Sequence, residues 1–208
     1  MVIDLTSDLA ASDSRDSLGE QTLVDAARSG DREAFGQLVL LHERVAVRTA
    51  LSALGQRADA EDAAQDAFLL AWRKLATFRG HATFRTWLLT IVWREATARR
   101  RAQQRWWRRL LPGRGDDEHT WSSPIDRLPA TGMNPEQIAV ARSQAARTAR
   151  AISRLSPKLR DTLLLTASGE HSYEEIGRLL AVPVGTVKWR VSEARRLVSQ
   201  AIEDHRET

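Results

Sequence analysis

The sequence lacks cysteine altogether and contains few aromatic residues and only three lysines. Without cysteine, disulfide bonds and zinc sites built from thiolates are excluded. No run of about 18 apolar residues is present to form a membrane-spanning helix. The acidic and polar start, MVIDLTSDLAASDSRDS, also lacks the basic, apolar and small-residue order of a signal peptide. We therefore expect a soluble cytoplasmic protein with no stable membrane insertion.

The chain also lacks the motifs of the common enzyme classes. No HExxH, P-loop or GxSxG pattern occurs, and the five histidines have no metal-ligand spacing. PGRGDDE resembles a phosphate-binding loop, but no Lys followed by Ser or Thr comes after it. We expect no enzymatic activity, no cofactor and no metal site.

Positive charge is carried almost wholly by arginine, with 28 Arg against three Lys and a net charge of +4. Arginine forms planar, bidentate contacts with phosphates and base edges. A genome rich in G and C would favour the same composition, so composition alone leaves nucleic-acid binding open. The location of the charge along the chain is more informative.

Apolar residues recur at three- and four-residue spacing through two long blocks, and no hairpin signal or internal repeat is present. The sequence therefore predicts an all-α fold of two small helical domains joined by a flexible linker. Between the blocks, WWRRLLPGRGDDEHTWSSPIDRLPATGMNP holds four of the six prolines and has no sustained periodicity. The expected organisation is a disordered tail (1–19), a first helical domain (20–105), a linker (106–135) and a second helical domain (136–204).

The stretch SYEEIGRLLAVPVGTVKWRVSEARRLV has the pattern of two helices separated by a tight turn. Ser172 and Glu175 form a capping box that starts the first helix. Pro183 ends that helix, because the residue before a proline is driven out of the helical region. Gly185 and Thr186 then allow the chain to turn and begin a second helix.

The second helix of this pair has a buried face and a basic face. Residues at +4, +3 and +4 spacing face inward, namely Val187, Val191, Ala194 and Val198. The residues expected to contact DNA are Thr186, Lys188, Trp189, Arg190, Ser192, Arg195 and Arg196. A basic helix after a short turn is typical of the recognition helix of a helix-turn-helix domain. Glu193 on this face can accept a hydrogen bond from a cytosine amino group, but phosphate repels it.

This stretch and the run LSPKLRDTLLL (155–165) before it resemble region four of the extracytoplasmic-function class of bacterial sigma factors. In that class a Leu-(Ser/Pro)-x-x-x-Arg helix precedes Tyr-Glu-Glu-Ile and Pro-Val-Gly-Thr-Val-Lys. The resemblance implies that this domain reads the −35 promoter element and packs on the flap of RNA polymerase. Trp189 and Glu193 depart from the family, which usually has Ser at the first position and frequently a basic residue at the second.

The segment DAEDAAQDAFLLAWRKLATFRGHATFRTWLLTIVWREATARRR resembles region two of the same class. The usual form there runs Asp-Ala-Glu-Asp-x-x-Gln-x-x-Phe, then Phe-Arg-Gly, then Phe-x-Thr-Trp-Leu. The resemblance implies that an acidic and amide face binds the clamp of core polymerase, through Glu61, Asp62, Gln65 and Asp66. It implies −10 DNA contacts by Arg79, His81, Thr83, Phe84, Arg85, Arg94, Arg99, Arg100 and Arg101. By spacing alone, Phe84, Trp87 and Trp93 are more typical of core residues.

The two resemblances together imply an alternative-type sigma factor that binds core RNA polymerase and promoter DNA. Its expected function is to direct initiation at −10 and −35 elements and to aid promoter melting, with control by an anti-sigma factor. A stand-alone helix-turn-helix regulator is the alternative, but it leaves the first domain without a role. A third interpretation places the WWRR segment on a membrane, and its apolar run is too short for strong binding.

Overall fold

The computed structural model describes residues 19–110 and 134–204, and within these ranges it contains helices and no strand. The all-α expectation is therefore confirmed. The first half holds a helix at 19–28, α2 (Arg32–Leu54), α3 (Arg57–Lys74), a 3-10 turn η1 (Leu75–Thr77) and α4 (Phe84–Leu110). The second half holds α5 (Pro135–Ser153), α6 (Pro157–Ala167), α7 (Tyr173–Leu180) and α8 (Val184–Asp204). The expected disordered tail, apart from Gly19, and most of the expected linker lie outside the described residues.

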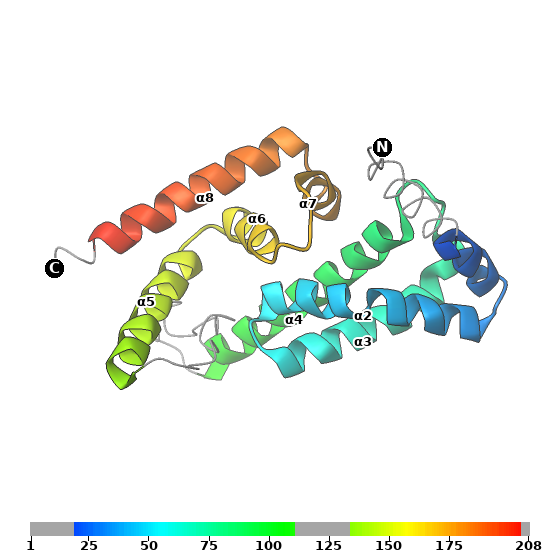
Figure 1. Cartoon of the computed structure of the whole chain (residues 1–208), viewed down its shortest axis with the longest axis horizontal. Helices are drawn as coiled ribbons and strands as arrows, with labels where there is room; N and C mark the ends of the chain where they lie inside the picture. The colour runs from blue at the N-terminus through cyan, green and yellow to red at the C-terminus, as the bar shows by residue number, and fades with distance from the viewer. Residues whose placement is uncertain (1–18, 111–133, 205–208) are drawn as a thin grey trace, which may run out of the picture.

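In the first domain, α2, α3 and α4 lie side by side (Figure 1). Asp31 caps α2, because its side chain accepts hydrogen bonds from the amides of Glu33 and Ala34. Fully buried alanines line α2 and α3, which allows the two helices to approach closely. Leu38 of α2 and Leu88 and Leu89 of α4 are also fully buried and fill the core of this bundle.

Aromatic rings fix the loop between η1 and α4. The Phe78 and Phe84 rings meet edge to face with centroids 6.0 Å apart, and Trp87 lies 5.3 Å from Phe78 and 5.8 Å from Phe84. Phe84 is only 3% exposed and Trp93 only 4%. The prediction from spacing that these are core residues is correct, and the packed rings hold the ends of the loop at 79–83 in place.

In the second domain, α5, α6 and α7 all pack against α8. The capping box predicted at the start of α7 is present, because Ser172 and Glu175 bond each other's backbone amides. Leu165 and Ile176 are fully buried beside Val187 and Val191 of α8. The inward face predicted for α8 is thereby confirmed at Val187, Val191 and Ala194.

The turn between α7 and α8 differs from the prediction. Ala181 makes the turn with φ 54°, in the left-handed region, and α8 has already begun at Val184, so Gly185 lies inside its first turn. Gly177, rather than Gly185, occupies a position with no room for a side chain, because a Cβ there would lie 2.8 Å from the carbonyl oxygen of Val182. The same approach lets the Val182 amide donate to the Gly177 carbonyl over 2.8 Å. The glycine that permits this turn is therefore in α7.

A second difference concerns the end of α4, which continues to Leu110 although the sequence predicts a linker from Trp106. The extra residues, WWRRL, contain no proline or glycine, so nothing in them interrupts the helical hydrogen bonds before Pro112. Trp106 is 55% exposed on this extension.

The two domains are in direct contact. Helix α6 packs on α2, and α7 packs on α4, so that α6–α8 lie along one side of the α2–α4 bundle (Figure 1). Leu165, Ile176 and Leu179 of the second domain belong to the same buried apolar cluster as the core of the first.

Candidate nucleic-acid and polymerase interface

The outer face of α8 is basic and carries one large aromatic side chain. Val187, Val191 and Ala194 face the core, so positions near 185, 189, 192 and 196 lie opposite them at 100° per residue. Trp189 is 63% exposed there. The residues expected to read DNA divide by exposure: Lys188, Trp189, Ser192, Arg195 and Arg196 are exposed, whereas Thr186 and Arg190 are half-buried at the edge of the face.

Glu193 does not present a free carboxylate on this face. Arg196 donates from Nε to Oε2 over 2.9 Å and from Nη2 to Oε1 over 2.7 Å, so both carboxylate oxygens are occupied. The hydrogen bond from Arg196 is the main cause that lowers the pKa of Glu193, and the same bond raises the pKa of Arg196. The cytosine contact considered for Glu193 would require this pair to separate. In the structure Glu193 holds the guanidinium of Arg196 in place.

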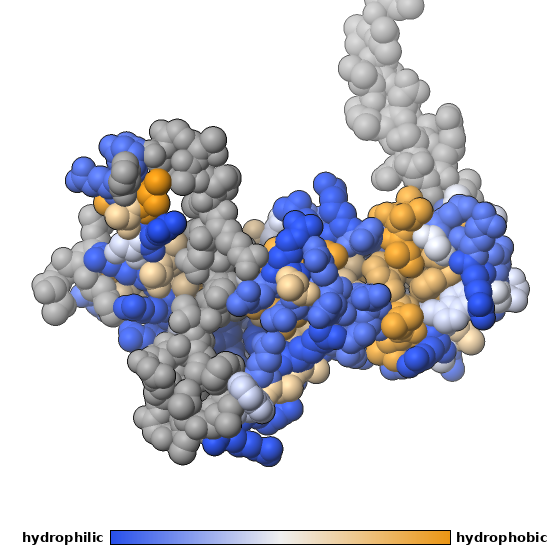
Figure 2. Space-filling model, turned by 90° about the horizontal axis from the view of Figure 1, so that it is seen from below, coloured by the Kyte–Doolittle hydropathy of each residue, from blue (hydrophilic) through white to orange (hydrophobic). Residues whose placement is uncertain are grey.

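The acidic face of α3 borders a groove between α2 and α3. Glu61, Asp62 and Gln65 line it, and all three are exposed. About half of the lining residues are apolar, Phe68 and Leu69 among them, and the others are charged or polar and include Arg44, Arg48 and Arg57; the groove has a volume of about 950 Å³. Figure 2 shows a hydrophobic band across the part of the molecule that carries these helices.

Exposed leucines on the same helices extend the apolar surface. Leu40 and Leu41 of α2 are 76% and 60% exposed, and Leu69 of α3 is 53% exposed. The surface therefore combines acids with unburied apolar area, which is typical of a protein contact. Two of the four predicted contacts already form ion pairs: Asp66 pairs with Arg99 of α4, and Glu61 pairs with Arg57 of its own helix at 2.6 Å.

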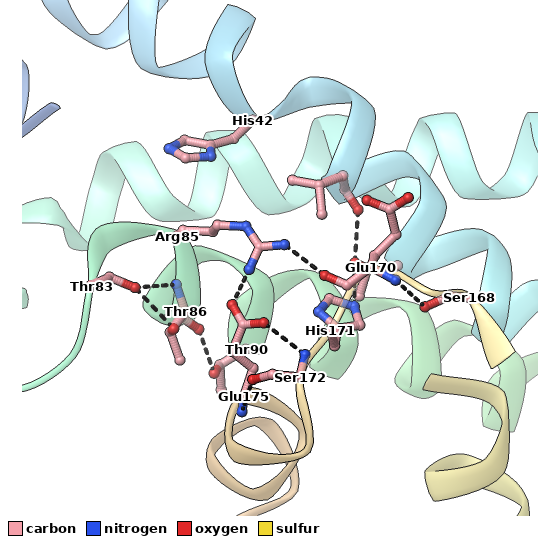
Figure 3. Close-up of polar contacts among 12 residues, drawn as sticks. His42, Thr83, Arg85, Thr86, Thr90, Ser168, Glu170, His171, Ser172 and Glu175 are labelled. Atoms are coloured by element: carbon pink, nitrogen blue, oxygen red, sulfur yellow. Dashed lines mark hydrogen bonds and ion pairs between the residues drawn. The ribbon is translucent and has the colours of Figure 1, made fainter. Parts of the chain in front are cut away.

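The residues expected at the −10 DNA divide into two groups. Arg79, His81 and Thr83 lie in the loop before α4, Arg94 and Arg101 lie on α4, and all five are exposed. Thr83 also supports the loop, since its hydroxyl bonds the Thr86 hydroxyl at 2.9 Å and accepts from the Thr86 amide at 3.2 Å (Figure 3).

The second group is engaged within the chain, and it includes Arg99, which is half-buried and pairs with Asp66. Arg85 donates to the carboxylate of Glu175 and to the carbonyl of Glu170 (Figure 3). Arg100 is 7% exposed and donates to Asp161 over 2.6 Å. Phe84 lies within the aromatic cluster, so stacking on a DNA base is excluded in this conformation. The sequence could not reveal this, because the residues that bury Arg100 and hold Arg85 belong to the other domain.

The contacts between the domains were not anticipated from the sequence. Asp161 and Glu170 precede the helix-turn-helix and have no motif of their own, and Glu175 was recognised only as a cap. Arg48 of α2 pairs with Glu170 at 2.7 Å, and the Thr49 hydroxyl lies 3.0 Å from Nε2 of His171. Three arginines of the first domain thus face three acids of the second, and no spacing in the sequence marks these pairs.

Neither a metal site nor a membrane span is found in the described ranges. Residues 19–110 and 134–204 contain no group of three His, Asp or Glu side chains placed to hold a metal ion. None of the helices in the described part is both long and apolar enough to cross a bilayer.

These features define an all-α protein of two domains, the second with an exposed basic recognition helix, and the comparisons with known proteins identify its class. Residues 38–106 match the family Sigma-70 region 2, and residues 146–198 match Sigma-70, region 4. The ECF RNA polymerase sigma-E factor of Escherichia coli is 30% identical over 196 residues, covering 89% of this chain and 95% of that protein. The RNA polymerase sigma-H factor of Pseudomonas aeruginosa is 29% identical, with 88% and 94% covered. The chain belongs to the extracytoplasmic-function sigma factors of the sigma-70 family.

Two solved structures have the same fold. CnrH in complex with the cytosolic domain of CnrY has a TM-score of 0.56 at 26% identity, over 89% of this chain and 98% of that one. The Bartonella quintana sigma factor RpoE, solved with the anti-sigma factor NepR, has a TM-score of 0.55 at 24% identity, over 81% and 96%. The chain spans nearly the full length of both.

Proposed function

We propose that the chain binds core RNA polymerase and directs it to promoters with −10 and −35 elements, acting in the cytoplasm and without catalysis of its own. Residues 20–105 bind core and the −10 element, residues 106–135 link the domains, and residues 136–204 read the −35 element. The observation that carries this proposal is the order of two family domains on one chain, with an exposed basic face on the recognition helix of the second. In a stand-alone helix-turn-helix regulator, the first domain would have no function.

Core polymerase binds at the groove between α2 and α3. Glu61, Asp62 and Gln65 present charge and amide groups at its edge, and Phe68 and Leu69 offer apolar surface within it. A helical partner with basic residues beside an apolar stripe fits both features. Asp66 joins this contact only if its ion pair with Arg99 opens.

At the −10 element, the loop before α4 provides the first contacts. Arg79, His81 and Thr83 are exposed there and need no rearrangement to meet single-stranded DNA. Arg94 and Arg101 on α4 are placed to contact the phosphate backbone, and each neutralised phosphate adds to the salt dependence of binding. Arg85 and Arg100 contribute after the two domains separate.

At the −35 element, α8 enters the major groove with Trp189 at the centre of its outer face. An exposed apolar ring among basic side chains suits contact with the C5-methyl group of thymine, which is the only apolar group on that groove floor. Arg196, held by Glu193, lies two turns further along and meets phosphate or a guanine edge. Lys188 and Arg195 flank this line and bind phosphates.

Control by an anti-sigma factor is part of the proposal. Both solved structures above are complexes: CnrH with the cytosolic domain of CnrY, and the sigma factor RpoE with the anti-sigma factor NepR. The exposed leucines and the groove on α2 and α3 supply apolar surface that an inhibitor can cover.

Run-off transcription tests this function. Purified core polymerase is incubated with genomic fragments, with and without the chain, and the transcripts are mapped. The proposal requires new start sites that depend on the chain, together with co-elution of the chain and core. A stand-alone regulator would instead bind a palindromic site without polymerase.

A further inference from the structure

We infer that the region-four domain has a second binding surface, an acidic face whose partner is the −10-reading face of the same chain. The surface consists of Asp161, Glu170 and Glu175, and it holds Arg48, Arg85 and Arg100. We call these six residues the clasp. The inference rests on the proposed function and extends it, because the clasp makes the isolated chain compete with DNA for its own arginines.

The first part of the clasp joins the start of α7 to the start of α4. Arg85 donates to the Glu175 carboxylate and, over 2.7 Å, to the Glu170 carbonyl (Figure 3). Arg48 forms an ion pair with the Glu170 side chain, with Nη1 2.7 Å from Oε1. Glu175 uses its other oxygen to cap the Ser172 amide at 2.9 Å, so its carboxylate is fixed by the helix that it starts. The acid that receives Arg85 is therefore held in position before the domains meet.

The second part is buried. Arg100 and Asp161 are 7% and 9% exposed, and Arg100 also donates to the carbonyl of Ala53 at 3.4 Å. Arg160 lies on the same side: burial is the main cause that lowers its pKa, the charge of Arg100 lowers it further, and Asp161 raises it. The Asp161 carboxylate thus pairs directly with Arg100 and also acts on the charge of Arg160, whose Nη1 donates to the Ser153 carbonyl at 3.2 Å. A buried ion pair of this kind is strongly destabilised when one partner is removed, because the other charge remains without compensation.

The clasp and promoter DNA exclude each other for two reasons. Arg85 and Arg100, both expected at −10 DNA, cannot contact phosphate while they bind acids of the other domain. In addition, elements named −10 and −35 lie about 25 base pairs apart, or roughly 85 Å at 3.4 Å per base pair. Two domains of this size in contact place their centres on the order of 30 Å apart.

The acidic residues can be changed without touching the DNA-reading face. Asp161→Asn keeps the size of the side chain and removes the charge that faces Arg100 and Arg160. Glu175→Gln keeps the capping box, which accepts either Glu or Gln. Glu174→Gln is the matched control, because Glu174 is exposed in the same first turn and lies outside the clasp. Circular dichroism verifies that all variants keep the same helix content.

Two readouts test the inference on the full-length chain without polymerase. Because the protein has no cysteine, spin labels at Ala76→Cys and Arg178→Cys, both exposed, report the distance between the domains. Fluorescence anisotropy reports binding of a labelled single strand that carries the −10 sequence of a start site mapped by run-off transcription. We expect Asp161→Asn with Glu175→Gln to lengthen and broaden the label distance and to tighten single-strand binding about tenfold, as the binding-competent fraction rises. Glu174→Gln should change neither.

An unchanged label distance in Asp161→Asn with Glu175→Gln would overturn the clasp. A longer distance with unchanged single-strand affinity would overturn its competition with DNA. The distance measurement needs neither polymerase nor promoter, so a failure of the proposed function, seen as absent start sites in run-off transcription, is distinguishable from a failure of the clasp.

Discussion

Arg100 of α4 and Asp161 of α6 form a buried ion pair, with Nη2 and Oδ1 2.6 Å apart across the boundary between the two domains. The pair predicts a specific result for a charge swap. We call the form in which the clasp is intact closed and the form in which the domains have separated open. Arg100→Asp and Asp161→Arg should each lengthen the spin-label distance towards that of the open form. The double variant should recover part of the closed population. The double-mutant cycle should give a coupling free energy of about 0.5–3 kcal/mol, as for residues in direct contact. Additive effects, with no recovery in the double variant, would contradict a direct pairing.

His171 predicts how the closed state responds to pH. Burial is the main cause that lowers its pKa and the charge of Arg85 adds to this, while Glu175 and Glu170 oppose it. In the open form His171 regains an ordinary pKa near 6.5, so the open form binds more protons. The closed form should therefore lose stability as pH falls below about 6.5 and be insensitive to pH above that value.

The label distance measured between about pH 8 and 5.5 tests this prediction. His171→Asn is the control, because its amide nitrogen can still donate to the Thr49 hydroxyl, whose own proton goes to the Val45 carbonyl, and because it does not titrate. The variant should give a flat profile over this range. An equal shift in the variant and in the parent protein would assign the pH effect to another group.

Two glycine substitutions in the helix-turn-helix should have opposite effects on stability. In Gly177→Ala the new Cβ would lie 2.8 Å from the backbone oxygen of Val182, so we expect a loss of about 1–3 kcal/mol in the free energy of unfolding. In Gly185→Ala nothing lies within 4 Å, and alanine favours the helix by about 0.5–1 kcal/mol. Urea denaturation measures both. Equal destabilisation by the two substitutions would contradict the placement of the turn.

Trp189 should determine a preference for thymine at the −35 element. Trp189→Ala should weaken transcription from a mapped promoter about tenfold, the equivalent of roughly 1.4 kcal/mol. Replacing the contacted thymine by uracil removes only the C5-methyl group. This change should weaken transcription directed by the parent protein and leave transcription directed by Trp189→Ala unchanged. Uracil scanning along the −35 element locates the base. If uracil at every position of the −35 element left transcription by the parent protein unchanged, the methyl contact would be excluded.

Charge reversal at the α2–α3 groove should affect core binding and little else. Asp62→Arg combined with Gln65→Ala replaces two exposed side chains, so the folded structure should keep its melting temperature, while co-elution with core polymerase should fall. Asp25→Arg, an exposed acid on the 19–28 helix, is the control and should co-elute normally. Unchanged co-elution of the double variant would remove Asp62 and Gln65 from the interface.

The sequence predicted what depends on local signals. The Ser172–Glu175 capping box and the inward valines of α8 could both be predicted, because each is fixed by spacing within one helix. The turn was misplaced because Ala181 has no local preference for a left-handed conformation, and the close approach that selects Gly177 comes from the tertiary fold. The clasp was not predictable, since Arg100 and Asp161 lie 61 residues apart and each looks like an ordinary surface charge.

The most direct test of the central claim is run-off transcription by purified core polymerase on genomic fragments, with and without this chain. We expect discrete new start sites, each preceded by the same pair of spaced elements, that appear only when both core polymerase and the chain are present. Absence of such sites, together with separate elution of the chain and core, would contradict it.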